Sequence, residues 1–258
     1  MNERERAVDS VEGRRIIVTG AAGGIGSGVL AGLANRGAKL GAIYNRTPPA
    51  DDLLPLAAWQ QCELDNKAKV EACFTSLADE LGGLDAMINV AGLWHGGPAD
   101  AADDEQIDFL ISANLKTVVF TNQAAFALMK DKGGRIVNFG SVEGIEGNVE
   151  SPIYASAKAA VHGWTRSAAL SWGGAGVTVN AVAPVMHTPV YSRIRTMMSA
   201  EELNEHDKEM ARRIVIGGKL GDAEKDCTPL LAFLASEGSR FVTGQLLAVD
   251  GGLHMMGA

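Results

Sequence analysis

Short apolar runs alternate with longer segments of helical periodicity along most of the chain. Runs of mainly apolar residues predict strands at 15–19, 39–44, 84–89, 135–139, 177–182 and 246–249, with a weaker candidate near 58–62. Helical patterns lie between them, at 24–36, 66–81, 103–131, 153–172 and 223–236. Strands that are apolar throughout and followed by helices are typical of a parallel sheet covered on both faces. The pattern therefore predicts a single doubly wound α/β domain with a parallel sheet of about seven strands.

Two segments depart from this rhythm. Residues 1–12 are charged and lack an apolar period, so we expect a disordered N-terminal arm before a domain that spans 13–258. The segment 186–220 separates a strand from the last helix by more than the usual short loop and contains two amphipathic stretches. Long connections of this kind tend to be binding loops or lids. We predict a helical substrate lid at about 186–220.

Composition excludes several classes of protein. The 258 residues carry a formal net charge of -8, and no basic stripe is present, which argues against a nucleic-acid or membrane partner. The three cysteines have no CxxC spacing, and the N-terminus has no signal-peptide pattern, so we expect free thiols and a cytoplasmic location. The five histidines form no HxH or HxxxH pair, and no metal site is predicted.

A glycine-rich turn follows the first predicted strand and leads directly into a helix. It reads Thr19-Gly-Ala-Ala-Gly-Gly-Ile-Gly26, with Gly20 suited to the turn, Gly24 to close approach and Gly26 to packing of helix on strand. Unpaired N–H groups at a helix start bind phosphate, and glycine lets a pyrophosphate approach them. Because no GKS or GKT sequence supplies a P-loop lysine, we predict a Rossmann-type site for a dinucleotide.

The end of the second predicted strand bears on the choice of dinucleotide. An NAD-selective site carries a carboxylate there, whereas this chain has Tyr44-Asn45-Arg46. Without a negative charge to repel a 2′-phosphate, and with Arg46 near enough to pair with one, NADP(H) is favoured, and NAD(H) stays an alternative.

Tyr154 and Lys158 stand four residues apart at the start of a predicted helix, which places both on one face. The spacing alone is common on protein surfaces, but this helix follows the strand 135–139, whose carboxyl end carries Ser141. Carboxyl ends of parallel strands form the ligand crevice, at the same edge as the glycine turn. An ammonium stabilises a phenolate and lowers its pKa from about 10. We therefore predict a proton-transfer pair, with Ser141 as a hydrogen-bond partner for the substrate oxygen.

Further motifs follow in order along the chain: Asn89-Val-Ala-Gly92, Asn114, Val179-Asn-Ala-Val-Ala-Pro184, Thr243-Gly-Gln and Asp250-Gly-Gly. Together with the glycine turn, Ser141 and Tyr154-xxx-Lys158, they resemble the short-chain dehydrogenase/reductase family, in the branch that includes 3-oxoacyl-carrier-protein reductases. The resemblance implies an oxidoreductase and a homotetramer.

The resemblance also implies roles for these residues. Tyr154 would be the general acid/base, and Lys158 would lower its pKa and hold the nicotinamide ribose. Ser141 would orient the carbonyl, and Asn114 would support a water chain that feeds Lys158. For Glu63, an exposed charge before a helix capped by Asp65 or Asn66 is an equally good interpretation. Residues expected at the cofactor are Gly20, Gly24, Ile25, Gly26, Tyr44, Asn45, Arg46, Glu63, Leu64, Asn89, Ala91, Gly92, Tyr154, Lys158, Pro184 and Thr188.

Two positions depart from the family pattern. Pro184-Val185 replaces the usual Pro-Gly, so the backbone there reaches positive φ less readily. Leu170 replaces an arginine that carrier-protein reductases carry, although Lys132 could still offer one basic contact.

These observations favour an NADP(H)-dependent enzyme that interconverts a secondary alcohol and a ketone, with a small, apolar or cyclic substrate. A 3-oxoacyl-thioester reductase is the alternative. A non-catalytic dinucleotide sensor is a remote one, because it would need no complete set of Ser141, Tyr154, Lys158 and Asn114.

Overall fold

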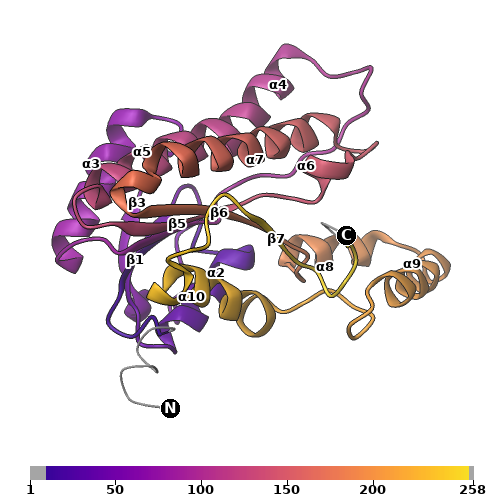
Figure 1. Ribbon diagram of the computed structural model, residues 1–258. Helices are drawn as coiled ribbons and strands as arrows, with labels where there is room; N and C mark the ends of the chain where they lie inside the picture. The colour runs from indigo at the N-terminus through magenta and orange to yellow at the C-terminus, as the bar shows by residue number, and fades with distance from the viewer. Residues whose placement is uncertain (1–9, 256–258) are drawn as a thin grey trace.

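A computed structural model, which describes residues 10–255, has three layers: a parallel sheet between two sets of helices (Figure 1). The sheet has seven strands in the order β3-β2-β1-β4-β5-β6-β7, and every neighbouring pair is parallel. The strands are β1 (Arg15–Thr19), β2 (Lys39–Tyr44), β3 (Ala58–Gln61), β4 (Ala86–Asn89), β5 (Gly134–Phe139), β6 (Val177–Pro184) and β7 (Leu246–Val249). The predicted doubly wound α/β fold is confirmed, and the weak seventh strand is β3.

Helices cover both faces of the sheet. The helices of the described chain are α2 (Gly24–Ala34), α3 (Lys67–Leu81), α4 (Asp104–Ile111), α5 (Thr117–Met129), α6 (Glu143–Glu146), α7 (Pro152–Trp172), α8 (Pro189–Met197), α9 (Ala200–Arg213) and α10 (Thr228–Ala235), and not all of them lie on the sheet. Figure 1 shows α3, α5 and α7 over one face and α2 and α10 over the other. Short 3-10 turns lie at Leu54–Leu56, Gly173–Ala175 and Glu237–Ser239, and π-helical turns at Ser112–Lys116 and Ala223–Cys227.

The burial of strand β1 on both faces explains its run of apolar residues. Ile16 and Val18 are buried in one core with Leu30 of α2, whereas Ile17 is buried in a second core with Phe74 of α3. Successive side chains of a strand point to opposite faces, so a sheet covered on both sides needs apolar residues at every position.

The helix predicted at 103–131 is interrupted by the π-helical turn Ser112–Lys116, which separates α4 from α5. A π-helical turn inserts a residue into the α-helical pattern and is often found at functional sites. This turn carries Asn114, whose side chain is fully buried.

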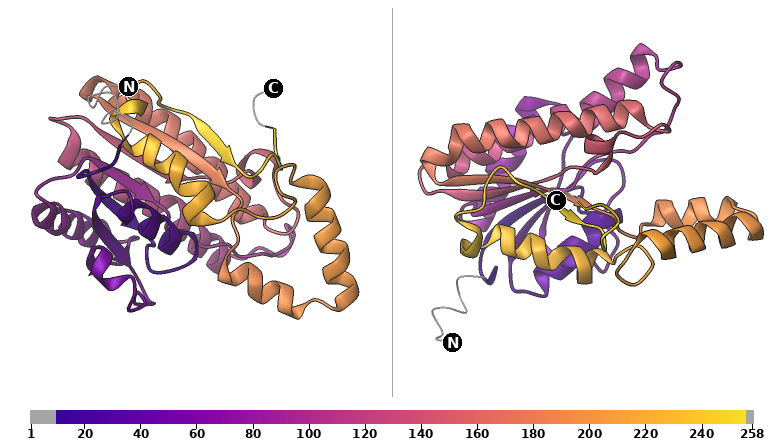
Figure 2. Two further views of the ribbon diagram at one scale, coloured as in Figure 1. Left: turned by 90° about the horizontal axis from the view of Figure 1, so that it is seen from below. Right: turned by 45° about the vertical axis from the view of Figure 1, so that its right-hand side comes forward.

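The segment 186–220 contains α8 and α9, so the prediction of helices there is confirmed. Figure 2 shows the two helices projecting beyond the sheet. They are joined by a hydrogen bond between Tyr191 Oη and His206 Nε2 (2.7 Å) and by an ion pair of Arg195 with Asp207, in which Nη2 lies 2.9 Å from Oδ2. Ser199 caps α9, and Glu202 completes a capping box.

The predicted disordered arm, 1–12, lies mostly outside the described residues. Val11 is buried in the core with Leu33 and Leu40, so the packed fold begins before the predicted boundary at residue 13. Among residues 10–255, none of the helices combines the length and hydropathy that crossing a membrane requires.

Candidate active site

The glycine-rich turn after β1 has the backbone that a pyrophosphate needs. Gly20 and Gly24 adopt φ of 65° and 57°, a region that favours glycine. A Cβ on Gly26 would lie 2.1 Å from the carbonyl oxygen of Gly20, so only glycine lets α2 pack against the turn. No side chain caps α2, and a Cβ at Gly23 or Gly24 would meet no described atom within 4 Å. Free N–H groups in front of open space fit an anionic phosphate.

A hydrogen-bond network holds the turn after β4 against the glycine turn. Thr19 Oγ1 donates to Asn89 Oδ1 (2.6 Å), Asn89 Nδ2 donates to Thr121 Oγ1 (3.0 Å), and Ala91 N donates to Thr19 Oγ1 (3.2 Å). The side chain of Asn89 is fully buried and is committed to this network. Asn89 therefore positions the turn from beneath, and of the predicted residues here Ala91 and Gly92 are the ones left to face a dinucleotide.

Asn114 and Lys158 converge on Gly92 from two different elements. A Cβ on Gly92 would lie 2.9 Å from Asn114 Oδ1 and 3.3 Å from Lys158 Nζ. The Asn114 amide is fixed because Nδ2 donates to the carbonyl oxygens of Leu93 (2.8 Å) and Leu110 (3.0 Å), and Oδ1 accepts from Leu93 N (3.1 Å). The structure thus brings these two predicted residues together. The water chain proposed for Asn114 stays a prediction.

Tyr154, Lys158 and Ser141 also lie together, at the carboxyl end of β5. Lys158 Nζ lies 5.5 Å from the centroid of the Tyr154 ring and donates to the carbonyl oxygen of Phe139 (2.8 Å). The Ser141 side chain lies near enough to the Tyr154 hydroxyl to lower its pKa. The Ser141 backbone N lies 3.3 Å from His162 Nε2, one turn further along α7 than Lys158. The predicted proton-transfer group is therefore assembled on β5 and α7.

The pKa of Tyr154 is raised above its usual range. Burial is the main cause, since it disfavours the phenolate, and the Glu143 carboxylate raises the pKa further, while the hydrogen bond from Ser141 lowers it. The pKa of Tyr154 is therefore raised, whereas the sequence predicted a lowered one, and the role of Lys158 stays a prediction. The Lys158 ammonium lies over the Tyr154 ring and donates to a backbone carbonyl.

Burial also acts on the two other titratable groups of α7 at this site. It lowers the pKa of Lys158 to about 8, against a raising effect of Glu143, because a buried ammonium loses its hydration. It lowers the pKa of His162 to about 4, with further lowering by Arg166 and Lys158. At neutral pH the lysine is therefore mostly charged, and the histidine is neutral and accepts a hydrogen bond from the Ser141 N–H.

The residues predicted around adenine lie at the ends of β2 and β3. Tyr44 packs at a tilt against Trp59, with ring centroids 6.4 Å apart, and Asn45 and Arg46 are exposed. Glu63 is exposed and its Oε2 lies 2.5 Å from Lys69 Nζ, while Asn66 caps α3 by accepting from Lys69 N (3.1 Å). The alternative interpretation of Glu63 included a helix cap at Asp65 or Asn66, and the cap at Asn66 is confirmed.

The side chain of Leu64 belongs to the core beneath α3, with Val70 and Cys73, so only its backbone is left to border an adenine. At this side of the crevice, Arg46 is the exposed cation that a 2′-phosphate would meet. Contacts of these residues with a dinucleotide stay predictions.

The predicted nicotinamide side is formed by the end of β6. Pro184 ends this strand, and Val185 continues its backbone bonding by donating to Val249 O (2.9 Å). All described residues with positive φ are glycines, so Val185 replaces the family's glycine without strain. Thr188 caps α8, and its Oγ1 accepts from Tyr191 N (3.1 Å). Ile25, in the first turn of α2, packs partly against the core.

Glu143 is a residue of this site that the sequence analysis missed. It stands two positions after Ser141 on the short helix α6, which was not predicted because four residues give no periodicity. A charged side chain directly after the carboxyl end of a buried strand was the available signal.

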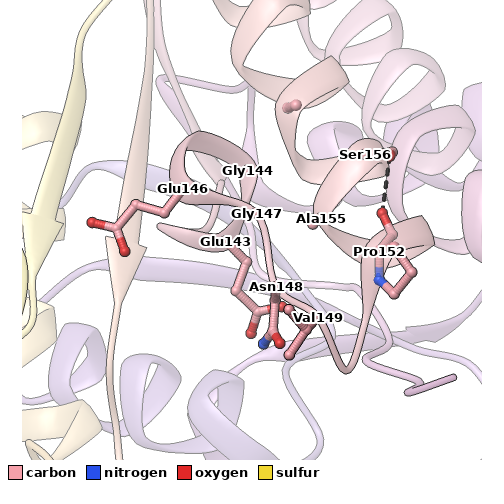
Figure 3. Close-up of a pocket in the computed structure, with 10 residues that line it drawn as sticks. Glu143, Gly144, Glu146, Gly147, Asn148, Val149, Pro152, Ala155 and Ser156 are labelled. Carbon is pink, nitrogen blue, oxygen red and sulfur yellow. Dashed lines mark hydrogen bonds between the residues drawn. The ribbon is translucent and has the colours of Figure 1, made fainter. Parts of the chain in front are cut away.

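A surface pocket of about 550 Å³ adjoins the site between α6 and the first turns of α7. Figure 3 shows the Glu143 side chain beside Asn148 and Val149, whereas Glu146 points away from them. The lining residues are Glu143, Gly144, Glu146, Gly147, Asn148, Val149, Pro152, Ala155, Ser156 and Ala159. None of the four predicted catalytic residues lines this pocket.

Comparisons with known proteins agree with the fold. Residues 20–254 match the family model described as Enoyl-(Acyl carrier protein) reductase. The chain is 34% identical to a 3-oxoacyl-(acyl-carrier-protein) reductase of Vibrio cholerae, over 96% of this chain and 100% of that protein. It is 31% identical to L-2,3-butanediol dehydrogenase of Corynebacterium glutamicum, over 92% and 97% of the two chains.

A solved structure of levodione reductase superposes with a TM-score of 0.84 at 25% identity, covering 93% of this chain and 97% of that one. The fold and the site define an oxidoreductase that acts on CH–OH groups. The chain belongs to the short-chain dehydrogenase/reductase family, whose members use NAD(H) or NADP(H).

Proposed function

We propose that the protein is an NADP(H)-dependent oxidoreductase that interconverts a secondary alcohol and a ketone of a small, apolar or cyclic substrate. One observation carries the proposal: Ser141, Tyr154 and Lys158 meet Asn114 at the edge of the sheet that also holds the glycine turn. Acid/base groups are thereby placed beside a site whose backbone fits a pyrophosphate.

The chain's own residues supply binding, orientation and proton transfer. A bound dinucleotide supplies the hydride, so the protein's task is to hold the reacting carbon against it. The neighbouring hydroxyls of Ser141 and Tyr154 would both bind the substrate oxygen. Tyr154 donates its proton to that oxygen in reduction, and the Lys158 ammonium behind the ring stabilises the phenolate that remains.

The preference for NADP(H) rests on the end of β2. Arg46 is exposed there, and no carboxylate stands among Tyr44, Asn45 and Arg46 to repel a 2′-phosphate or to bind a ribose hydroxyl. An arginine guanidinium is well suited to pair with a phosphate.

The substrate class rests on the walls of the crevice. Leu93 and Trp94 follow β4 and are each 50% exposed. Their loop lies against the loop after β5, since Gly97 N donates to Glu150 O (2.8 Å). We infer that this apolar surface, with α8 and α9 as a lid, holds the substrate. Two relatives whose names describe small alcohols or ketones, the butanediol dehydrogenase and the levodione reductase, support this choice.

Consumption of NADPH with a panel of small ketones and cyclic diketones tests the proposal. We expect turnover with at least one of them, and we expect Tyr154→Phe to lower kcat by roughly 10²–10⁴-fold, the usual contribution of a general acid. The Kd for NADPH and the circular dichroism spectrum of the variant should match those of the wild type. Near wild-type turnover by a folded Tyr154→Phe protein would refute the acid/base role.

A second candidate is a 3-oxoacyl-thioester reductase, favoured by the identity to the Vibrio cholerae enzyme over nearly the whole chain. Against a carrier-protein partner, Leu170 is 87% exposed at a position where such reductases carry an arginine. Acetoacetyl-CoA and an acetoacetyl carrier protein in the same panel decide between the two. A kcat/KM for a thioester that exceeds every value for a free ketone would replace our first choice with the second.

A further inference from the structure

The carboxylate of Glu143 is hydrogen-bonded at the start of α7, the helix that carries Tyr154 and Lys158. Its Oε2 accepts a hydrogen bond from Ser151 Oγ (2.5 Å), and its backbone N donates to Ser141 Oγ (3.2 Å). Ser151 is buried and is the residue that precedes α7. Glu143 is therefore tied both to the serine that contacts the Tyr154 hydroxyl and to the start of the helix that carries Tyr154.

The packing of α6 on α7 holds the backbone that carries this carboxylate in place. A Cβ on Gly144 would lie 2.7 Å from Ala159 N and 2.8 Å from the carbonyl carbon of Lys158. The helix α6 thus rests directly on the turn of α7 that carries the catalytic lysine. A carboxylate at the N-terminus of α7 is also stabilised by the helix dipole.

Among the described residues, Glu143 is the charge that shifts the pKa of both members of the pair. From the other elements packed against α7, Asn114 contributes a neutral amide, and His162 on α7 itself is neutral at pH 7. Lys158 is buried and forms no salt bridge with any described residue within 4 Å.

We propose that Glu143 is a positioning residue that keeps Tyr154 protonated and Lys158 charged, so that the site is set to donate a proton to a carbonyl at neutral and mildly alkaline pH. In that reduction the carbonyl carbon receives a hydride from the reduced nicotinamide, and the carbonyl π electrons move to the oxygen. The oxygen then takes the Tyr154 proton, and the phenolate left behind is reprotonated through the Lys158 ammonium. This inference rests on the proposed function, because it concerns the same proton donor.

Because the negative charge of Glu143 acts on both Tyr154 and Lys158, the effect of Glu143→Gln can be predicted. The amide keeps an oxygen that accepts from Ser151 Oγ, but it removes the charge, so both Tyr154 and Lys158 lose their protons more readily. In pH profiles of kcat/KM, the alkaline limb of ketone reduction and the acidic limb of alcohol oxidation should both move to lower pH. We expect each limb to move by about one pH unit, the lower end of the shift that a neighbouring charge produces. At a pH below the midpoint of the acidic limb, kcat/KM for oxidation would then be about tenfold higher than in the wild type.

Glu146→Gln is the matched control. Glu146 lies on the same helix, but it points away from Glu143, and its Oε2 lies 3.3 Å from His254 Nε2 (Figure 3). Its profile should coincide with that of the wild type. If Glu143→Gln does not fold, Ser151→Ala frees the carboxylate from its hydrogen bond and should move both limbs in the same direction by a smaller amount.

The outcomes separate this inference from the proposed function. A wild-type protein that turns over no carbonyl substrate contradicts the proposed function. Turnover by the wild type, with profiles of Glu143→Gln and Ser151→Ala that coincide with it, overturns the role of Glu143 alone. An equal shift in Glu146→Gln would also overturn it, since the effect would then come from overall charge.

Discussion

The steric limit at Gly26 gives the sharpest test of the dinucleotide site. Gly26→Ala places a Cβ 2.1 Å from the Gly20 carbonyl oxygen. Carbon–oxygen contacts settle at about 3.3 Å or more, so α2 and the turn must separate by roughly 1 Å. Neither atom is the end of a flexible side chain, so the backbone itself has to move. Such overpacking costs about 1–3 kcal/mol, which corresponds to a fall in Tm of roughly 2–10 °C for a chain of this size.

The same displacement should weaken dinucleotide binding. The N–H groups at the start of α2 are aimed by the turn, and a shift of roughly 1 Å takes them out of hydrogen-bond range of a phosphate. Hydrogen bonds to charged groups contribute about 1.5–3 kcal/mol, so the Kd for NADPH should rise roughly 10–100-fold.

Fluorescence titration with NADPH and a thermal melt of the free protein measure the two effects. The control is Gly23→Ala, at a residue with extended φ of -170° and a Cβ position that meets no described atom within 4 Å. Its Tm should equal that of the wild type. Retention of both Tm and Kd by Gly26→Ala would refute the reasoning, and a fall in Tm with unchanged Kd would place the dinucleotide elsewhere.

Two further predictions concern the cofactor preference and the pH dependence. Arg46→Ala should raise the Kd for NADPH by roughly 10–100-fold through loss of a charge-assisted contact and leave the Kd for NADH unchanged; a wild type that prefers NADH would overturn the assignment. Because burial lowers the pKa of Lys158 to about 8, its ammonium is present below that pH and lost above it, so kcat/KM for ketone reduction should fall as pH rises through about 8. A profile that stays flat to pH 10 would contradict a role for the charged lysine.

Most of the sheet could be predicted because its central strands are buried on both faces, whereas the edge strands β3 and β7 are only partly buried. β1 and β5 contain almost only residues that suit a core, and their bounds match the predicted ones to within a residue. The helix predicted at 103–131 shows the limit of periodicity. A π-helical turn shifts the register by one residue without changing the composition, so the interruption at Ser112–Lys116 left no mark in the apolar pattern.

The candidate site was predictable where a backbone requirement or a fixed spacing dictates the residue, as at Gly20, Gly26 and the Tyr154–Lys158 pair. The site was not predictable where the role of a residue depends on its burial and its neighbours in the fold. Asn89 is a motif residue, but its side chain faces Thr19 and Thr121 inside the fold, which spacing cannot reveal. The pKa of Tyr154 was predicted in the wrong direction because a sequence shows the neighbouring lysine but not the extent of burial.

Burial gives Lys158 the property that a proton relay needs. An exposed ammonium keeps its proton up to about pH 10, whereas the site lowers the pKa of this one to about 8, close enough to neutral for release and recapture during turnover. Because the pKa of Tyr154 is raised and that of Lys158 is lowered, the proposed transfer of a proton from Lys158 to a newly formed Tyr154 phenolate would be downhill. The opposite transfer, which oxidation of an alcohol requires, is uphill in the same site. In the proposed mechanism this difference would favour reduction near neutral pH, and Glu143, which raises the pKa of both groups, would set the pH at which that preference is lost.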